Sequence, residues 1–490
     1  MDPWAGITFW NIDLLNKNAM DVKIGLFGIG LDTYWGQFEG LLKRLTGYQE
    51  YIAQKMQGYG ATVMDAGLVD SPEKAGTAAE YLKKNDVEMV FLYVSTYALS
   101  STVLPVAQKL KVPVIILNLQ PVPAINYETF NALGDRGKMT GDWLAHCQAC
   151  SVPEIANVFN RAGIQYDFVT GYLEEPAAWD AIRSWIEAAH VVNVMRNNRL
   201  GVLGHYYGGM LDVYTDLTMQ STVFGTHIDL LEMCELKKHR DEATDNEIQQ
   251  KLMEFHKTFD VSEECEANEI ERAARTSVAL DKLVENHNLG SLAYYYEGES
   301  GNDYEDIVTS VIAGNTLLTG RNVPVAGECE VKNAQAMKIM DALGTGGSFS
   351  EFYAMDFNDD VVLLGHDGPA HFAIAEGRVK LVPLPVYHGK PGKGLSIQMS
   401  VKHGDVTLLS VVQGKDGIFL LVAEGESVSG PTLQIGNTNS RYRFSIGARE
   451  FINQWSKQGP AHHCAIGIGH VADKIKKLGF LLDIEVVRIC

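Results

Sequence analysis

Four polar residues in the last third of the chain stand in apolar or glycine-rich surroundings. They are Glu328 in Val-Ala-Gly-Glu-Cys-Glu, Glu351 in Gly-Gly-Ser-Phe-Ser-Glu-Phe-Tyr, His366 in Leu-Leu-Gly-His-Asp-Gly-Pro, and His463 in Pro-Ala-His-His-Cys-Ala. Two carboxylates and two imidazoles are a suitable ligand set for a divalent ion such as Mn²⁺, with positions left for substrate oxygens. These residue types therefore predict a metal centre that acts on an oxygen-rich substrate.

A second interpretation of the same residues involves no metal. Exposed acids and packing histidines are common, and the intervals of 23, 15 and 97 residues between the four positions match no local metal-binding signature. Each of the four is expected where a helix or strand ends. Glu328 follows the strand-like 323–326, and His366 follows the apolar run 361–364 ahead of an Asp-Gly-Pro turn. The residues alone leave both interpretations open.

The elements that must position these residues change character along the chain. The first third alternates short β-rich runs, such as 22–27 and 88–94, with amphipathic stretches such as 36–57, as a doubly wound parallel sheet requires. A second α/β block begins near Asp167. After Gly344, closely spaced β runs with glycine-containing turns predict an antiparallel barrel or sandwich. The expected fold is α/β, with two Rossmann- or flavodoxin-like domains followed by a β-rich domain built as an antiparallel barrel.

The length of 490 residues agrees with about three domains of roughly 150 residues each. We expect an N-terminal arm over residues 1–20, an N-terminal α/β domain over 21–172, a central α/β domain over 173–327 and a β-rich C-terminal domain over 328–490. The charged segment 237–269 is expected to be a solvated helical pair.

Two further motifs are weaker. Gly28-Ile-Gly30 follows the first predicted strand, where a dinucleotide fingerprint would stand, but Thr33 takes the place of the third glycine, so a tight turn is the better interpretation. Open α/β sheets still bind ligands at this edge, which keeps residues 32–35 as candidate substrate contacts. Cys147-Gln-Ala-Cys150 has no second pair of metal ligands and is expected to be a pair of buried helical thiols.

Composition argues against several classes of partner. Lys and Arg number 41 against 61 Asp and Glu, a formal charge of −20, so nucleic acid is not an expected partner. The longest apolar runs, such as 89–94 and 112–117, are far shorter than the ~20 residues that span a bilayer, so no membrane partner is expected. Seven cysteines, an odd number, and the lack of a signal-peptide pattern indicate a soluble cytoplasmic protein with reduced thiols.

At its four polar segments the chain resembles the L-arabinose isomerase branch of the arabinose/fucose isomerase family. The matching features are a Gly-Glu before a helix, Ser-Phe-x-Glu-x-Tyr after a Thr-Gly-Gly loop, a Gly-His after a strand, and an Ala-His-His near the C-terminus. The resemblance runs from about Lys23 to Val487, and it is specific in the last third and loose in the first. It implies a sugar isomerase that uses a divalent metal, Mn²⁺ in the first place and Co²⁺ in the second.

The resemblance also implies residue roles. Glu328 and Glu351 would be the catalytic pair that moves protons through an enediol, and both would bind the metal together with His366 and His463. The active site would form between subunits of a homotrimer or homohexamer. The substrate, a small sugar, would contact Asp32, Trp35, Tyr97 and Gln120 of the neighbouring subunit, with Met210 and Tyr353 lining the pocket.

Two departures from the family pattern concern the residues that would contact the sugar. Arabinose isomerases carry Gly-Ser-Gln-His-Leu-Tyr-Gly after the first strand, where this chain has Gly30-Leu-Asp-Thr-Tyr-Trp-Gly36, and their Gln-Thr-Ala-His is Gln120-Pro-Val-Pro123 here. The expected substrate is therefore a pentose, hexose or deoxy sugar that need not be arabinose. The alternatives are an isomerase or epimerase of another sugar derivative and a non-catalytic sugar-binding protein.

Overall fold

The structure is a computed structural model of the chain. It describes residues 22–297, 301–387, 390–391 and 393–490, so the predicted arm over residues 1–20 lies outside the described residues. The described chain divides into two compact units, a first unit of residues 22–193 and a second unit of residues 194–490, and each is considered by itself. Among the described helices, none is long and apolar enough to cross a membrane.

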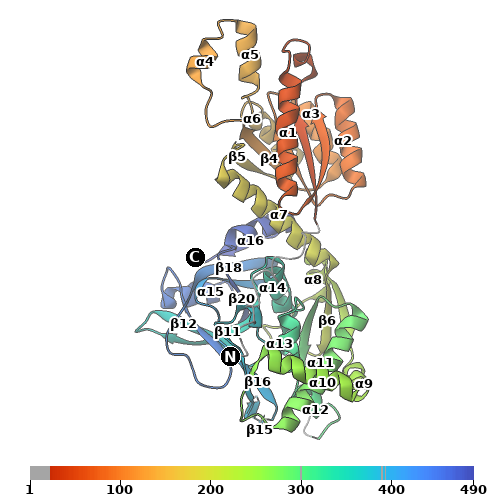
Figure 1. The fold of residues 1–490 in the computed structure, drawn as a ribbon, viewed down its shortest axis with the longest axis vertical. Helices are drawn as coiled ribbons and strands as arrows, with labels where there is room; N and C mark the ends of the chain where they lie inside the picture. Colours follow the sequence, from red (N-terminus) through yellow and green to blue (C-terminus); the bar gives the residue numbers. More distant parts are fainter. Residues whose placement is uncertain (1–21, 298–300, 388–389, 392) are drawn as a thin grey trace, which may run out of the picture. The chain divides into compact units, whose positions relative to one another are not determined.

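The first unit is a doubly wound α/β fold on one parallel sheet, ordered β2-β1-β3-β4-β5 (Figure 1). Its strands are β1 (Lys23–Ile29), β2 (Thr62–Val69), β3 (Met89–Val94), β4 (Val114–Gln120) and β5 (Tyr166–Tyr172). Its helices are the 3-10 turn η2 (Asp32–Tyr34), α1 (Leu41–Gln57), α2 (Pro72–Lys84), α3 (Ser100–Leu110), α4 (Tyr127–Asn131), α5 (Arg136–Leu144) and α6 (Val152–Ala162). The next helix, α7 (Pro176–Asn197), continues into the second unit. Apolar side chains of α2, α3 and α6 form one core with those of β1, β3 and β4. This strand order confirms the expected flavodoxin-like arrangement and places the ligand-binding edge at the carboxyl ends of β1 and β3.

The second unit begins with another parallel sheet, ordered β10-β9-β6-β7. Its strands are β6 (Arg199–Gly204), β7 (His227–Leu231), β9 (Ser291–Tyr295) and β10 (Val325–Ala326), and the helices of this part are α8 (Leu217–Phe224), α9 (Met233–Asp241), α10 (Asp245–Thr258), α11 (Ala267–His287), α12 (Glu305–Val308), α13 (Ile312–Thr319), the 3-10 turn η3 (Gly327–Cys329) and α14 (Val331–Ala342). The charged segment 237–269 contains the end of α9, all of α10 and the start of α11. A capping box of Thr244 and Glu247 begins α10.

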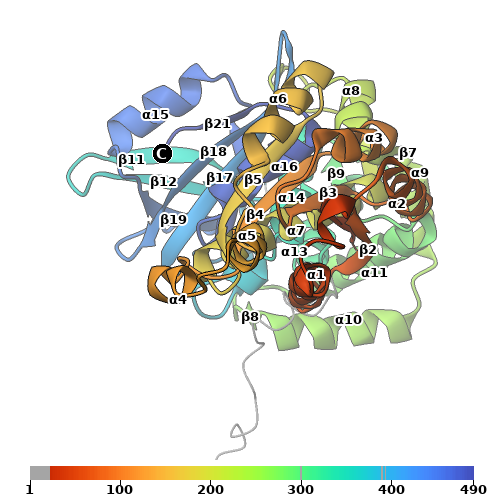
Figure 2. The same ribbon diagram turned by 90° about the horizontal axis from the view of Figure 1, so that it is seen from above.

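The rest of the second unit is an antiparallel barrel. Its strands follow one another in the order β17-β20-β11-β12-β19-β18, and β18 pairs with β17 to close the ring. They are β11 (Ser348–Asp356), β12 (Val361–His366), β17 (Gly404–Gly414), β18 (Gly417–Val428), β19 (Thr438–Arg443) and β20 (His463–Ile468). Figures 1 and 2 both show barrel strands on one side of this unit and α9, α10 and α11 on the other. The expected β-rich barrel is confirmed.

Shorter elements complete the second unit. They are β8 (Asp260–Val261), η4 (Phe372–Ile374), β13 (Lys380–Pro383), β14 (Val386–Tyr387), β15 (Lys390–Pro391), β16 (Leu395–Gln398), α15 (Ala448–Lys457), α16 (Ala472–Leu482) and β21 (Val486–Arg488). β16, β13 and β8 form a separate small sheet, β14 pairs with β15, and β21 adds to β18 in parallel.

Helix α14 joins the two halves of the second unit. All of its side chains from Val331 to Asp341 are buried, including the polar Lys332 and Gln335. The helix contacts β9 and β10 of the parallel sheet and β17 and β20 of the barrel. The sheet and the barrel therefore share one continuous core. The domain boundaries at 172/173 and 327/328 remain predictions.

Two local expectations from the sequence are wrong. Glu351 does not lie at the end of an element, because it stands inside β11. Cys147 and Cys150 are not helical thiols, because they form a disulfide in the turn between α5 and α6. Strand β11 was missed because its Ser-Phe-Ser-Glu-Phe-Tyr sequence resembles a loop followed by the start of a helix. The disulfide was missed because an isolated Cys-x-x-Cys motif does not indicate whether its two sulfur atoms are bonded.

Candidate metal and catalytic site

Three barrel strands and the last strand of the parallel sheet bring the four predicted ligands together. In the ring, β11 lies between β20 and β12. Glu351 of β11 pairs on one side with His463, the first residue of β20, and on the other with Gly365, which precedes His366 at the end of β12. Glu328 belongs to η3, which directly follows β10. Strand register therefore gathers residues that are far apart in sequence.

The ligand atoms form two groups that share His463. Glu351, His366 and His463 each offer an atom within 4.8 Å of the others, and the same holds for Glu328, His462 and His463. Glu328 Oε2 lies 3.5 Å from His463 Nε2, and Glu328 Oε1 lies 3.9 Å from His366 Nε2. Such separations resemble the roughly 3–4 Å between ligands of one octahedral cation. Carboxylates and imidazoles are the donors that suit Mn²⁺ and Co²⁺.

The buried carboxylate of Glu330 sets the tautomer of His463. His463 Nδ1 donates to Glu330 Oε2 at 2.5 Å, and both side chains are almost fully buried. His463 Nε2 has no hydrogen-bond partner among the described residues. A ring that donates from Nδ1 keeps a lone pair on Nε2, which is the arrangement of histidines that bind metals. The residues present therefore fit a divalent cation on this side.

His366 is held differently from His463. Both rings pack against Phe349, with centroids 4.4 and 4.3 Å away. The Gly368 amide donates to His366 Nδ1 at 2.8 Å. A neutral ring that accepts at Nδ1 carries its proton on Nε2. Coordination through Nε2 therefore requires the other tautomer, which carries the proton on Nδ1 and loses the hydrogen bond from Gly368.

The backbone at Glu328 is strained. Glu328 and Cys329 have φ values of 55° and 58°, in the left-handed region that favours glycine. Both residues are buried. Conformations of this kind cost about 1–3 kcal/mol each and cluster at functional sites. The surrounding packing thus holds the Glu328 carboxylate in a position that the chain would not adopt by itself.

His462 connects Glu328 to a loop that follows β6. Asp212 in this loop accepts from His462 Nδ1 at 2.6 Å and from the His462 backbone N–H at 3.0 Å. His462 Nε2 lies 3.4 Å from Glu328 Oε2. The hydrogen bond with Glu328 and that with Asp212 raise the pKa of His462 to about 9 against the effect of burial. A protonated imidazole offers no lone pair to a metal, so His462 is suited to holding Glu328 in place.

Lys332 links this loop to the partner of His463. Its ammonium lies 3.5 Å from Glu330 Oε1 and donates to the backbone oxygen of Asp212. Lys332 is buried in α14. One buried cation thus fixes Glu330 and the Asp212 loop together.

Glu351 and Tyr353 share β11. Burial raises the pKa of Glu351, although the imidazoles of His463 and His462 oppose the shift. A carboxyl group with a raised pKa exchanges protons more readily near neutral pH. The Tyr353 hydroxyl accepts from the Asn437 amide at 2.8 Å, and burial raises its pKa as well.

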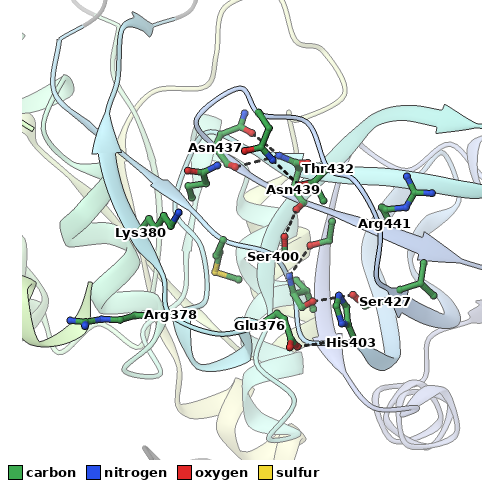
Figure 3. A pocket seen from close by; sticks show the side chains of 17 residues that line it. Glu376, Arg378, Lys380, Ser400, His403, Ser427, Thr432, Asn437, Asn439 and Arg441 are labelled. Carbon is green, nitrogen blue, oxygen red and sulfur yellow. Dashed lines mark hydrogen bonds between the residues drawn. The ribbon is translucent and has the colours of Figure 1, made fainter. Parts of the chain in front are cut away.

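A polar pocket of about 380 Å³ lies beside the barrel, lined by residues of β13, β16, β18 and β19 and their loops (Figure 3). Amides and hydroxyls such as Ser400, Asn437 and Asn439 dominate its wall. None of the four predicted metal ligands lines it. Its connection to the site is Asn437, the partner of Tyr353. The pocket is therefore a neighbour of the site and not the place of the chemistry.

The remaining predicted substrate residues fall in two places. Met210 lies in the loop after β6, two residues before Asp212. Four others belong to the first unit, at the carboxyl ends of β1, β3 and β4: Asp32, Trp35, Tyr97 and Gln120. Trp35 Nε1 donates to Asp70 at 2.8 Å, and the Gln120 amide donates to the backbone oxygen of Pro123 at 2.8 Å. These four stand in a different unit from the metal ligands, and their role remains a prediction.

Known proteins resemble this chain over the site and beyond it. Residues 346–485 match the family model of the L-arabinose isomerase C-terminal domain, a span that contains Glu351, His366 and His463. A sulfoquinovose isomerase of Priestia aryabhattai is 19% identical over 441 residues, which cover 89% of this chain and 94% of that protein. A sulfoquinovose isomerase of Alkalicoccus urumqiensis is 21% identical over 330 residues, covering 66% of this chain and 72% of that protein. An L-arabinose isomerase of a Nocardioides species is 22% identical over 357 residues, covering 69% and 68%. The chain is therefore similar to L-arabinose isomerases over its β-rich part, and to named isomerases of this kind over two thirds or more of its length.

The relatives are named as isomerases, which supports the predicted class of reaction, that of a sugar isomerase. The sequence prediction missed three residues that the structure adds to the site, His462, Glu330 and Asp212. The doublet Ala-His-His and the spacing Glu328-x-Glu330-x-Lys332 were visible signals for the first two. No local pattern pointed to Asp212, because its partner lies 250 residues away.

Proposed function

We propose that this arabinose isomerase-like protein is a divalent-metal-dependent aldose–ketose isomerase that works through an enediol. The observation that carries the proposal is the barrel register, which sets Glu351 opposite His463, the residue shared by the group with Glu351 and His366 and the group with Glu328 and His462. One carboxylate in each of two groups that share a histidine suits proton transfer between adjacent carbons and oxygens of a sugar.

The four ligands would hold Mn²⁺ or Co²⁺, and the bound cation would supply Lewis-acid polarisation of the sugar's carbonyl and neighbouring hydroxyl oxygens. Glu328 and Glu351 share the proton transfers. One carboxylate removes the proton from C2 and delivers it to C1, and the other moves the hydroxyl proton between the two oxygens. The raised pKa of Glu351 suits it to accept and release a proton in both directions.

The residues around the carboxylates keep them in position. Glu330 orients His463, and the Asp212–His462 pair contacts Glu328 on its other side. Groups held by partners of their own lose less conformational freedom when the substrate binds. This arrangement supports a site that is organised before the sugar arrives.

We propose that the substrate is a pentose, hexose or deoxy sugar, and that the residues contacting it differ from those that contact L-arabinose in arabinose isomerases. The support is the sequence Gly30-Leu-Asp-Thr-Tyr-Trp-Gly36 in place of the pattern of arabinose isomerases, together with Pro123 in place of their histidine. Relatives named sulfoquinovose isomerase match the chain over up to 89% of its length, so an aldose with an anionic substituent belongs among the candidates.

The test measures ketose formation from a panel of aldopentoses, aldohexoses, deoxy sugars and sulfoquinovose. The metal-free protein should be inactive, and Mn²⁺ or Co²⁺ should restore turnover. Glu351→Gln should keep the fold and lower kcat by at least about 10²-fold, the usual effect of a lost acid or base. Glu263→Gln, which changes an exposed glutamate between β8 and α11, is the matched control and should retain full activity. Undiminished turnover without metal, or binding of aldoses with no turnover of any, would overturn the proposal.

A further inference from the structure

The disulfide between Cys147 and Cys150 is a chemical feature that the proposed isomerisation does not use. The two Cα atoms are 5.5 Å apart, and the bond closes the turn that joins α5 to α6 in the first unit (Figure 1). The other five cysteines are free thiols. This turn therefore carries the one disulfide among the cysteines that the structure describes.

The two sulfur-bearing residues differ in access to solvent. Cys150 is exposed, whereas Cys147 is 2% exposed. An external thiolate therefore reaches the Cys150 sulfur, and Cys147 is the leaving group. Cys150 also stands directly before Ser151, the N-cap of the 11-residue helix α6. The positive end of the helix dipole favours a negative charge on the Cys150 thiolate, which the second step of an exchange releases.

We propose that Cys147 and Cys150 form a thiol–disulfide exchange site that reacts with dithiols, and that its state controls the order of the segment 95–98. A thiolate of the dithiol attacks Cys150 Sγ, the Cys147–Cys150 bond breaks, and Cys147 leaves as a thiolate that takes up a proton. The second thiol of the dithiol attacks the mixed disulfide and releases Cys150. The protein gains two electrons and two protons, and the dithiol becomes a disulfide.

The turn is fastened to the segment 95–98, which follows β3. Four hydrogen bonds make the connection: Gln148 Nε2 to the Ser95 oxygen at 2.9 Å, Ser151 Oγ to the Ala98 oxygen at 3.0 Å, the Ala98 N–H to Ser151 Oγ at 2.8 Å, and Thr96 Oγ1 to the Leu144 oxygen at 2.7 Å. The three side chains that make these bonds, those of Gln148, Ser151 and Thr96, are all buried. Buried hydrogen bonds of this kind are costly to break, so a change in the turn is transmitted to the segment.

The segment 95–98 also carries Tyr97, one of the predicted substrate residues. Tyr97 and Trp35 pack against the cluster that contains Leu144 and Ala145, immediately before the disulfide. Opening the disulfide therefore loosens the support of both aromatic residues. A consequence for sugar binding rests on the proposed function, whereas the exchange reaction itself does not.

The exchange reaction is tested by counting thiols. Folded protein is treated with dithiothreitol or with its oxidised form, quenched in acid, denatured and alkylated, and the peptide that contains Cys147 and Cys150 is analysed by mass spectrometry. We expect no label after oxidation and two labels after reduction, while Cys234, an exposed free cysteine, is labelled in both samples. The proposal would be overturned if Cys147 and Cys150 remained disulfide-bonded in dithiothreitol, or remained free thiols in its oxidised form.

The proposed effect of the disulfide on the order of the segment 95–98 is tested by amide hydrogen exchange. Reduction should speed exchange at residues 95–98 and 144–151 by about tenfold or more, as expected for local opening, and leave α10 unchanged. Cys150→Ser should show the fast exchange without dithiothreitol and should not respond to it, whereas Cys234→Ser should behave like the parent. Equal exchange in both states, or a response of Cys150→Ser to the reductant, would contradict the coupling. Both measurements are independent of isomerase activity, so the two proposals can fail separately.

Discussion

At the scale of residues, His463 shows how strongly one ligand depends on the side chains behind it. It belongs to both groups of candidate ligands, and its ring is fixed by Glu330, which is in turn 3.5 Å from Lys332. Both partners are buried, so neither hydrogen bond nor charge is screened by water. We therefore expect the metal affinity of the proposed site to depend partly on residues that do not contact the metal.

Glu330→Gln is the first prediction at this scale. The amide keeps the shape of Glu330 but lacks the charge that holds the Nδ1 proton of His463, and it leaves Lys332 without its buried anion. We expect Mn²⁺ affinity, measured by calorimetry, to fall about 10–100-fold, the range typical for partners of metal-binding histidines. Glu450→Gln, at an exposed position of α15, should bind Mn²⁺ like the parent. An unchanged affinity in a folded Glu330→Gln protein would mean that His463 is oriented by something else.

At the scale of elements, the site depends on how closely β12 approaches its neighbours. Gly365 precedes His366, and a Cβ atom at this position would lie 2.1 Å from the Thr438 oxygen of β19 and 2.7 Å from Tyr353 Cε2 of β11. Real Cβ atoms do not come so close to a backbone oxygen. The glycine is therefore required for β12 to lie in the ring with His366 at its end.

Gly365→Ala should separate β12 from β19 and displace both His366 and Tyr353. Overpacking of this kind costs about 1–3 kcal/mol, so thermal unfolding should begin several degrees lower and Mn²⁺ binding should weaken. The matched control is Gly414→Ala in β17 of the same barrel, where the nearest atoms to an added Cβ are 3.7 and 3.8 Å away. We expect this variant to unfold and bind Mn²⁺ like the parent. Equal behaviour of the two variants would show that the close approach of β12 is not needed.

At the scale of the whole molecule, the candidate residues are divided between two compact units. The predicted metal ligands, Met210 and Tyr353 belong to the second unit, and four predicted substrate residues belong to the first. The family resemblance predicts a homotrimer or homohexamer in which the first unit of one subunit completes the site of its neighbour. A division of this kind can be tested by mixing defective subunits.

The prediction concerns two variants that are each folded and inactive, His463→Ala and Trp35→Ala. In hybrid oligomers assembled at random from equal amounts, about a quarter of the shared sites would combine an intact metal side with an intact substrate side. Co-expression should therefore restore about a quarter of the parent activity. Trp35→Ala mixed with Gln120→Ala is the control and should stay inactive, because both changes affect the same side. Inactive hybrids of confirmed mixed composition would argue for a site built within one subunit.

The sequence by itself determined the fold class and pointed to the residues of the candidate site. Alternating apolar runs and amphipathic stretches were sufficient for the parallel sheets, because strand and helix periods are local properties. Glu328, Glu351, His366 and His463 were found because carboxylates and imidazoles in apolar or glycine-rich segments are unusual. The roles predicted for them came from the family resemblance and not from their spacing.

Only the tertiary structure decided which of these residues meet. Glu351 and His463 are 112 residues apart and become neighbours through the register of β11 with β20, which depends on closing the ring of strands. Register is a property of strand pairs, and a shift of one residue would turn Glu351 to the other face of the barrel. The same holds for Glu330 beside His463, for Asp212 beside His462, and for the disulfide of Cys147 and Cys150, whose sulfurs are brought together by a turn packed on the first unit. Sequence patterns record which chemical groups a segment carries, whereas the contacts among distant groups arise when the whole core forms.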